Sequence, residues 1–198
     1  MNAPNDMRQH ILNAAKPVIL GKGFSAAGLN EILASAGVPK GSFYHYFKSK
    51  EAFGEALLDE YFREYIHALD GLLGDVSRPA AQRLLAYWQE WQSLQCSGAP
   101  EGQCLAVKLG GEVSDLSEAM RSALQKGTRG IIARISVCIA EGQQDGSLAA
   151  DINAPQTAQA LYEMWLGATL LAKMWRQPEV LNSAMASTRQ LLGLNKAQ

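Results

Sequence analysis

Apolar residues recur at intervals of three and four along nearly the whole chain, and no sustained alternation of apolar and polar residues interrupts them. Spacing of three and four puts side chains on one face of an α-helix, whereas alternation is typical of a half-buried strand. The pattern therefore predicts an all-α fold. The expected helices span about 6–22, 29–35, from 39, from 51 to the glycines at 71 and 74, 79–96, 102–111, 115–142, 155–176 and 178–192.

Charge divides the chain into two parts. Residues 1–50 hold six cations and two anions, a net charge of +4, while residues 51–198 carry a net charge of −5. Phosphate would attract the first part and repel the second. We therefore expect a small basic domain over 1–50 and an acidic helical domain over 51–198.

The segment from Pro39 to Lys50 has the composition of a helix that reads DNA. Three short helices with a glycine-containing turn before the third place one exposed helix in the major groove. Tyr44 and Tyr46 differ by about 200° around a helix, so both cannot face the core. The positive end of the next helix would also attract a phosphate. We expect DNA contacts from eight residues: Lys40, Gly41, Ser42, Tyr44, His45, Tyr46, Lys48 and Lys50.

Residues 36–53 read Ala-Gly-Val-Pro-Lys-Gly-Ser-Phe-Tyr-His-Tyr-Phe-Lys-Ser-Lys-Glu-Ala-Phe and resemble the DNA-binding signature of the TetR family of bacterial transcriptional regulators. The resemblance covers about the first 55 residues and implies a helix-turn-helix DNA-binding domain over 1–50, followed by a helical regulatory and dimerisation domain over 51–198. It implies that residues 40–42 read bases, and that Tyr44, Tyr46 and Lys50 hold phosphates. Ala27 stands where the family commonly has a capping threonine, so Gly28 or Ser25 must cap the second helix here.

The last two expected helices carry apolar stripes suited to dimerisation. One helix-turn-helix reads only half of a two-fold site, so a two-fold dimer makes twice as many DNA contacts. Five positions from 161 to 175 advance by four, three, four and three, which is typical of a helix–helix seam. The TetR resemblance implies that these helices pair with their counterparts; the alternative is that the stripes serve only the core of one chain. The expected interface residues are Leu161, Trp165, Ala168, Ala172, Trp175, Leu181 and Met185.

The chain has three cysteines, whose spacing among three histidines matches no metal-binding pattern, so we expect free thiols and no metal or cofactor. Cys104 lies near an expected helix N-terminus, where the dipole lowers a thiol pKa, and Lys108 follows four residues later. Lys173 lies in an apolar run and needs an anionic partner, for which a thiolate or Glu163 is available. Cys96 and Cys138 are expected to be small buried apolar residues.

Residues 102–109, 112–113, 115–123 and 166–168, together with Lys173, are similar to the NemR subgroup of the TetR family, the repressors of N-ethylmaleimide reductase. Members of this subgroup repress detoxification enzymes until electrophiles or oxidants react with cysteine. The resemblance implies that Cys104 is the sensing cysteine. Ser114 occupies a place where a second cysteine can occur, which removes one possible disulfide partner. The expected partners are double-stranded operator DNA, a second copy of the chain and a small electrophile or oxidant.

Two other functions stay open. A TetR-type regulator can instead bind a noncovalent hydrophobic inducer, with pocket walls from Trp88, Trp91, Met120, Trp165 and Met174. An all-α enzyme is the other class, but the sequence has no P-loop, no Gly-x-Ser-x-Gly and no His-Glu-x-x-His motif.

The expected location is the cytoplasm. The first residues lack the basic and apolar pattern of a secretory signal. The apolar stretch 164–172 is far shorter than the roughly 20 residues of a membrane span, so we expect no membrane partner.

Overall fold

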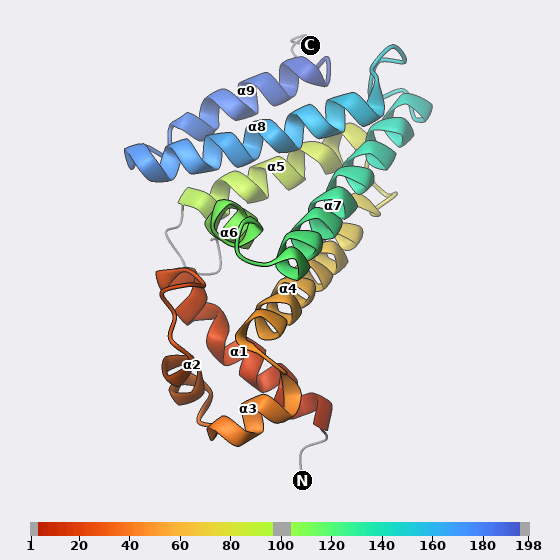
Figure 1. Ribbon diagram of the computed structural model, residues 1–198. Helices are drawn as coiled ribbons and strands as arrows, with labels where there is room; N and C mark the ends of the chain where they lie inside the picture. Colours follow the sequence, from red (N-terminus) through yellow and green to blue (C-terminus); the bar gives the residue numbers. More distant parts are fainter. Residues whose placement is uncertain (1–3, 97–103, 195–198) are drawn as a thin grey trace. The chain divides into compact units, whose positions relative to one another are not determined.

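The computed structural model describes residues 4–96 and 104–194, and over these residues the chain forms nine α-helices and no strand, which confirms the all-α prediction. Predicted and observed helix ends agree within about three residues. The helices are α1 (Pro4–Lys22), α2 (Leu29–Ala36), α3 (Lys40–Tyr46), α4 (Lys50–Leu73), α5 (Ala80–Cys96), α6 (Leu105–Ser114), α7 (Glu118–Gln144), α8 (Ala154–Trp175) and α9 (Val180–Leu191), as labelled in Figure 1.

Two compact units make up the chain. The first contains Met1–Arg63 and Gln103–Gly127, and the second contains Glu64–Gly102 and Thr128–Gln198. The first unit thus holds α1 to α3, here called the head, together with most of α4, all of α6 and the beginning of α7. A functional boundary at residue 50 stays a prediction, since this division reflects packing and not function.

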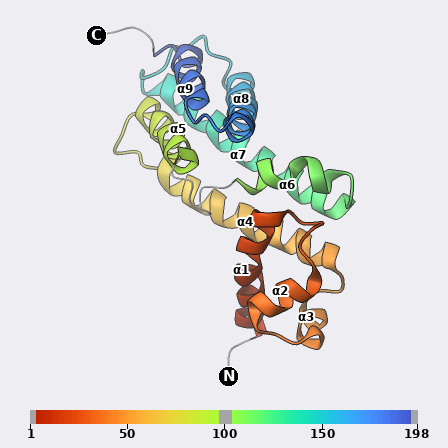
Figure 2. The same ribbon diagram turned by 90° about the vertical axis from the view of Figure 1, so that its left-hand side faces the viewer.

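The head is a three-helix core (Figure 2). Gly37 ends α2 in the left-handed conformation, with φ 63°, and Pro39 is the N-cap of α3. Gly28, and not Ser25, is the N-cap of α2, and it makes no side-chain hydrogen bond there. The fully buried Phe43 ring lies 5.2 Å from the Phe47 ring centroid and fixes the inner face of α3.

Helices α4 and α7 pack closely where α7 carries glycine. In the first unit Gly127 lies against the ring of Phe62, and a Cβ atom there would collide with it. In the second unit a Cβ at Gly130 would lie 3.0 Å from Ile66 Cδ1, and Arg134 pairs with Asp70 at 2.5 Å.

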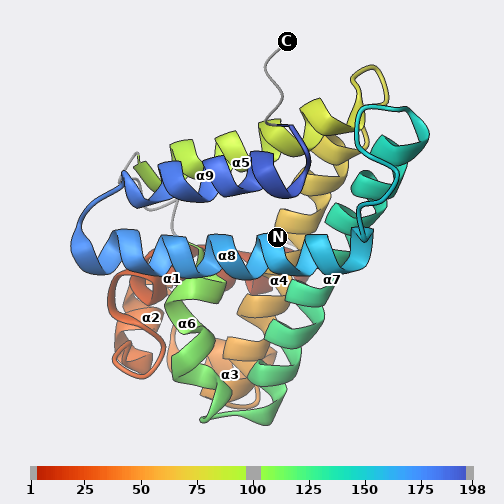
Figure 3. The same cartoon turned by 90° about the horizontal axis from the view of Figure 1, so that it is seen from above.

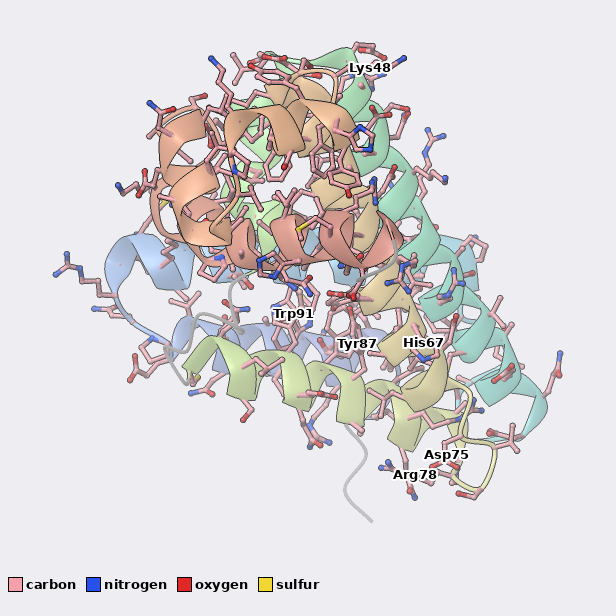
Figure 4. The ribbon with its side chains drawn as sticks, turned by 90° about the horizontal axis from the view of Figure 1, so that it is seen from below. Lys48, His67, Asp75, Arg78, Tyr87 and Trp91 are labelled. Carbon is pink, nitrogen blue, oxygen red and sulfur yellow. The ribbon has the colours of Figure 1, made fainter. Side chains whose placement is uncertain are left out.

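The second unit is built on an aromatic core between α5 and α8, with α9 beside α8 (Figure 3). The Trp88 and Trp165 rings stack with centroids 5.0 Å apart. The Trp91 indole donates to Thr169 at 2.9 Å, and the Trp165 indole donates to Thr188 at 2.9 Å. Figure 4 shows Trp91 beside Tyr87 on α5. None of the helices described has the length and hydropathy of a membrane span.

Candidate functional site

Helix α3 presents most of its expected DNA contacts to solvent. Its inner face is Phe43, while Lys40, Gly41 and His45 are exposed and Ser42 is half-buried. The exposed Lys40 ammonium lies 5.9 Å from the Tyr44 ring centroid, so the two side chains occupy one surface. This arrangement leaves polar groups of one short helix available to base edges.

Neither tyrosine of α3 is buried. Tyr44 is 46% exposed and meets Phe43 edge-on, and Tyr46 is half-buried beside His45. A tyrosine with a packed ring and an accessible hydroxyl is suited to hold a phosphate.

The two lysines after α3 differ. Lys48 is exposed and is labelled in Figure 4. Lys50 is half-buried, with its ammonium 4.8 Å from the Phe24 ring centroid and 3.4 Å from the Ser25 carbonyl oxygen. Lys50 therefore also binds the turn that connects α1 to α2.

The expected sensor thiol lies at the start of α6, beside α4. Cys104 is partly exposed and is the N-cap of α6. The Tyr61 hydroxyl of α4 donates to the Cys104 sulfur at 3.6 Å, and the Lys16 ammonium of α1 lies 5.8 Å from the Tyr61 ring centroid. A group added to this sulfur would therefore press on both α4 and α6.

The expectation of a lowered thiol pKa is wrong. Burial raises the pKa of Cys104 above its ordinary value, although the backbone N–H groups of Val107 and Ala106 and the Tyr61 hydroxyl act to lower it. Loss of hydration outweighs the donors at the end of the helix. The resting sulfur is consequently a thiol at neutral pH.

The two expected lysine partners of the thiol have other surroundings. The Lys108 ammonium donates to the Gly21 carbonyl of α1 at 3.4 Å. Lys173 is exposed on α8 and belongs to the second unit, whereas Cys104 and Lys108 belong to the first. The structure therefore places Lys108, but not Lys173, in one compact unit with the thiol.

The other two cysteines differ in exposure. Cys96, the last residue of α5, is exposed, contrary to the expected burial. Cys138 is buried, and its burial raises the thiol pKa to about 11. Ser114 donates its hydroxyl to the Gly110 carbonyl at 2.5 Å and so completes the last turn of α6.

Several residues expected at a dimer interface are internal. Leu161, Trp165 and Leu181 are fully buried within the chain, so their spacing reflects its own core rather than an exposed seam. Ala168 is buried, Ala172 and Met185 are half-buried, and Trp175 is 56% exposed. The large apolar side chains exposed on these two helices are Leu170, Leu171, Met174, Trp175 and Leu191.

The five residues expected to line a hydrophobic pocket do not form one wall. Trp88, Trp91 and Trp165 come together in the second unit. Met120 is buried in the first unit, where its side chain approaches Gly54, and Met174 is 65% exposed.

Sequence reasoning missed two residues beside the expected sensor. The sequence pattern gives neither Tyr61 nor Glu112 a role at this site. Glu112 accepts hydrogen bonds from the backbone N–H groups of Ser25 and Phe24, which lie 87 and 88 residues away in the chain. Helical periodicity carries no signal for such contacts.

Known proteins match both parts of the chain. Residues 11–57 match the family described as bacterial regulatory proteins, tetR family, and residues 80–188 match the tetracyclin repressor-like C-terminal domain. The HTH-type transcriptional repressor NemR of Escherichia coli is 43% identical over 188 residues, which cover 95% of this chain and 94% of that protein. The HTH-type transcriptional repressor DhaR of a Mycobacterium species is 35% identical, with 91% and 89% covered.

A solved structure agrees with these sequence matches. The crystal structure of E. coli NemR in its reduced form matches with a TM-score of 0.90 and 43% identity, over 97% of this chain and 100% of that one.

Proposed function

The chain belongs to the TetR family of bacterial regulatory proteins, and from this premise we propose a transcriptional repressor that leaves its operator when an electrophile or oxidant reacts with Cys104. A repressor works where the chromosome lies, which is the cytoplasm. The DNA-binding part of the proposal is supported by the exposed polar face of α3 and by the net charge of +4 over residues 1–50.

One contact carries the sensing part, namely the hydrogen bond from the Tyr61 hydroxyl to the Cys104 sulfur. Tyr61 lies on α4, which begins at Lys50, four residues after α3 ends. A group bonded to the sulfur removes this contact and adds volume between α4 and α6. Packed helices respond to added volume by moving between discrete arrangements, so an adduct would favour a head geometry that fits the operator less well.

The chemistry with a Michael acceptor such as N-ethylmaleimide is simple. The Cys104 thiol loses its proton to solvent, and the sulfur electron pair forms a bond to an alkene carbon. The carbon–carbon double bond opens, and the neighbouring carbon takes a proton from water. Because burial raises the pKa of Cys104, little thiolate is present at neutral pH, and the site should discriminate in favour of strong electrophiles.

The test compares operator binding before and after alkylation. DNA flanking the gene is footprinted to find the site, and a labelled duplex then reports affinity by fluorescence anisotropy. Wild-type protein should lose at least about 5-fold in affinity after N-ethylmaleimide, a typical size for coupled sites. Cys104→Ser should bind equally well and not respond, whereas Cys96→Ser, the matched control at the exposed thiol, should respond like wild type. Release that persists in Cys104→Ser would refute sensing at this residue.

The active form in this proposal is a homodimer. Each head reads one half-site, and the exposed apolar side chains of α8 and α9 are the surfaces a second copy would cover. Trp175→Ala should raise the dimer dissociation constant in sedimentation equilibrium, since exposed tryptophans often dominate interfaces. An unchanged dissociation constant would show that the dimer interface lies elsewhere.

A noncovalent inducer is the second candidate, and one atom favours it. Among the described residues, the Trp88 indole nitrogen is buried without a hydrogen-bond partner. An aromatic ligand with a carbonyl oxygen would satisfy it. Release of operator by such compounds from Cys104→Ser, with quenching of tryptophan fluorescence, would favour this candidate over the covalent one.

A further inference from the structure

The turn between α1 and α2 is bound by a carboxylate from α6. Glu112 accepts a hydrogen bond from the Ser25 N–H at 2.6 Å through one oxygen, and from the Phe24 N–H at 3.2 Å through the other. All three residues lie in the first compact unit. Hydrogen bonds to a charged acceptor are about twice as strong as neutral ones. We call this arrangement the Glu112 clamp.

Gly23 makes room for the carboxylate. Its φ is 91°, a conformation that favours glycine, and it ends α1. A Cβ atom at this position would lie 2.8 Å from a Glu112 oxygen, closer than real Cβ contacts. The backbone conformation and the absent side chain together let the acid reach the two N–H groups.

The charges around the turn complement the clamp. Burial alone would raise the pKa of Glu112, but hydrogen bonds from Ser25 and Phe24 and the charge of Lys108 hold it below its ordinary value. Lys108, one turn earlier on α6, donates to the Gly21 carbonyl at 3.4 Å. Helix α6 therefore binds the last turn of α1 through a C=O group and the turn that follows through two N–H groups.

The same turn is also bound from α4, through the Lys50 ammonium and the Ser25 carbonyl. The turn leads directly into α2, and α2 packs against α1 and α3. The position of this short segment therefore sets where α2 begins, and α2 supports the helix expected to read DNA.

We infer that Glu112 is the positioning residue that connects α6 to the head, and that a change at Cys104 reaches the DNA-binding surface through the Glu112 clamp. The inference rests on the proposed function, since it describes the route by which that function operates. Cys104 is the N-cap of α6 and Glu112 lies two turns further along the same helix. A helix displacement of about 1 Å takes an N–H···O distance out of its normal range. The clamp therefore holds for one position of α6 and not for a displaced one.

Three variants distinguish the charge of Glu112, the geometry of its hydrogen bonds and a general effect of losing a carboxylate from this unit. Glu112→Ala removes the clamp. Glu112→Asp keeps the charge but shortens the reach, so at least one hydrogen bond is lost. Glu118→Ala is the matched control, because Glu118 is exposed in the same compact unit and pairs only locally with Arg121.

The readout is the ratio of operator dissociation constants after and before N-ethylmaleimide, with the Cys104 adduct counted by mass spectrometry in each variant. Wild type and Glu118→Ala should give the same ratio, at least about 5-fold. Glu112→Ala, which lacks the clamp, should bind operator before alkylation about as weakly as wild type does after it and so give a ratio near 1, and Glu112→Asp should fall between. A wild-type ratio in fully alkylated Glu112→Ala and Glu112→Asp would overturn the inference while leaving the proposed function intact.

Hydrogen exchange keeps the inference testable if a variant does not fold or if wild type shows no release. In reduced wild-type protein the Phe24 and Ser25 amides should exchange slowly, and alkylation of Cys104 should speed their exchange severalfold. Unchanged exchange of these two amides after alkylation would overturn the clamp as the route. A wild-type ratio of 1 with faster exchange would refute the proposed function but support the connection.

Discussion

Each of the two compact units has a buried apolar core, but the polar contacts inside them differ in burial. In the second unit, Trp88 and Trp165 stack in a fully buried core, and the Trp165 indole is satisfied by Thr188. In the first unit, α6 buries an apolar face but also makes part-exposed polar contacts. Tyr61 connects it to α4, while Lys108 and Glu112 connect it to the end of α1 and the turn that follows. Buried apolar packing is costly to disturb, whereas isolated polar contacts break for little free energy. The second unit is thus suited to be a fixed scaffold, and the α6–head contacts are suited to change state.

The largest expected effect is on the scaffold. Trp165→Ala should lower the free energy of unfolding by about 3–5 kcal/mol, because it empties a buried site and leaves Thr188 without its donor. Urea denaturation followed by circular dichroism measures the loss. Trp165→Phe should lose less stability. In the folded fraction of either variant, N-ethylmaleimide should change the operator dissociation constant by the same factor as in wild type. A loss below about 1 kcal/mol in Trp165→Ala would show that this core is not the rigid part.

Removal of the clamp should cost much less. Glu112→Ala is expected to lose about 1–2 kcal/mol of stability, since charge-assisted hydrogen bonds are lost but the carboxylate is part-exposed and screened. The same denaturation experiment measures it. A loss as large as that of Trp165→Ala would contradict the distinction between the two units.

The clamp also predicts a pH dependence. Because the folded-state pKa of Glu112 is lowered, the clamp contributes stability above the ordinary glutamate pKa and loses it as pH falls through the lowered value. The stability difference between wild type and Glu112→Gln should therefore be greatest near neutral pH and shrink in acid. A difference that grows on acidification would have the wrong sign.

A still smaller effect on stability is expected at the thiol. Tyr61→Phe removes one hydroxyl and should cost about 1 kcal/mol or less. The Tyr61 hydroxyl acts to lower the Cys104 pKa, so its loss should move the pH–rate profile of alkylation to higher pH and slow the reaction at neutral pH. Stopped-flow measurement with N-ethylmaleimide provides the profile. An unshifted profile would exclude Tyr61 as a partner of the sulfur.

At the exposed DNA face, stability should hardly change. Lys48→Ala is expected to stay within about 0.5 kcal/mol of wild type, yet to reduce the slope of log affinity against log salt by about 1. Lys50→Ala should cost more stability, since Lys50 also binds Phe24 and Ser25. Equal losses of stability in the two variants would show that the contacts of Lys50 with Phe24 and Ser25 do not stabilise the fold.

Local features of the fold could be predicted from the sequence. The glycine-containing turn predicted before the third helix is present, with Gly37 as the C-cap of α2 and Pro39 as the N-cap of α3. Apolar spacing of three and four predicted the helices, because such periodicity is a property of one segment at a time. The exposed face of α3 followed from the same reasoning, since Phe43 and Phe47 occupy the inner positions.

Long-range relations could not be predicted in this way. Periodicity shows that Leu161 and Trp165 share a face, but not whether that face meets the chain's own core or a partner. The contacts of Glu112 with the turn at 24–25 join segments almost 90 residues apart. The pKa of Cys104 depends on burial by the folded chain, and helix position alone gave the wrong direction.

The central claim is that one adduct at Cys104 weakens the hold of the head on DNA. The direct measurement uses protein in which Cys96→Ser and Cys138→Ser leave Cys104 as the single thiol, titrated with N-ethylmaleimide while adduct mass and operator anisotropy are recorded together. The account predicts that loss of binding rises in proportion to the fraction of Cys104 carrying one adduct. Full occupancy of Cys104 with operator affinity unchanged would contradict it.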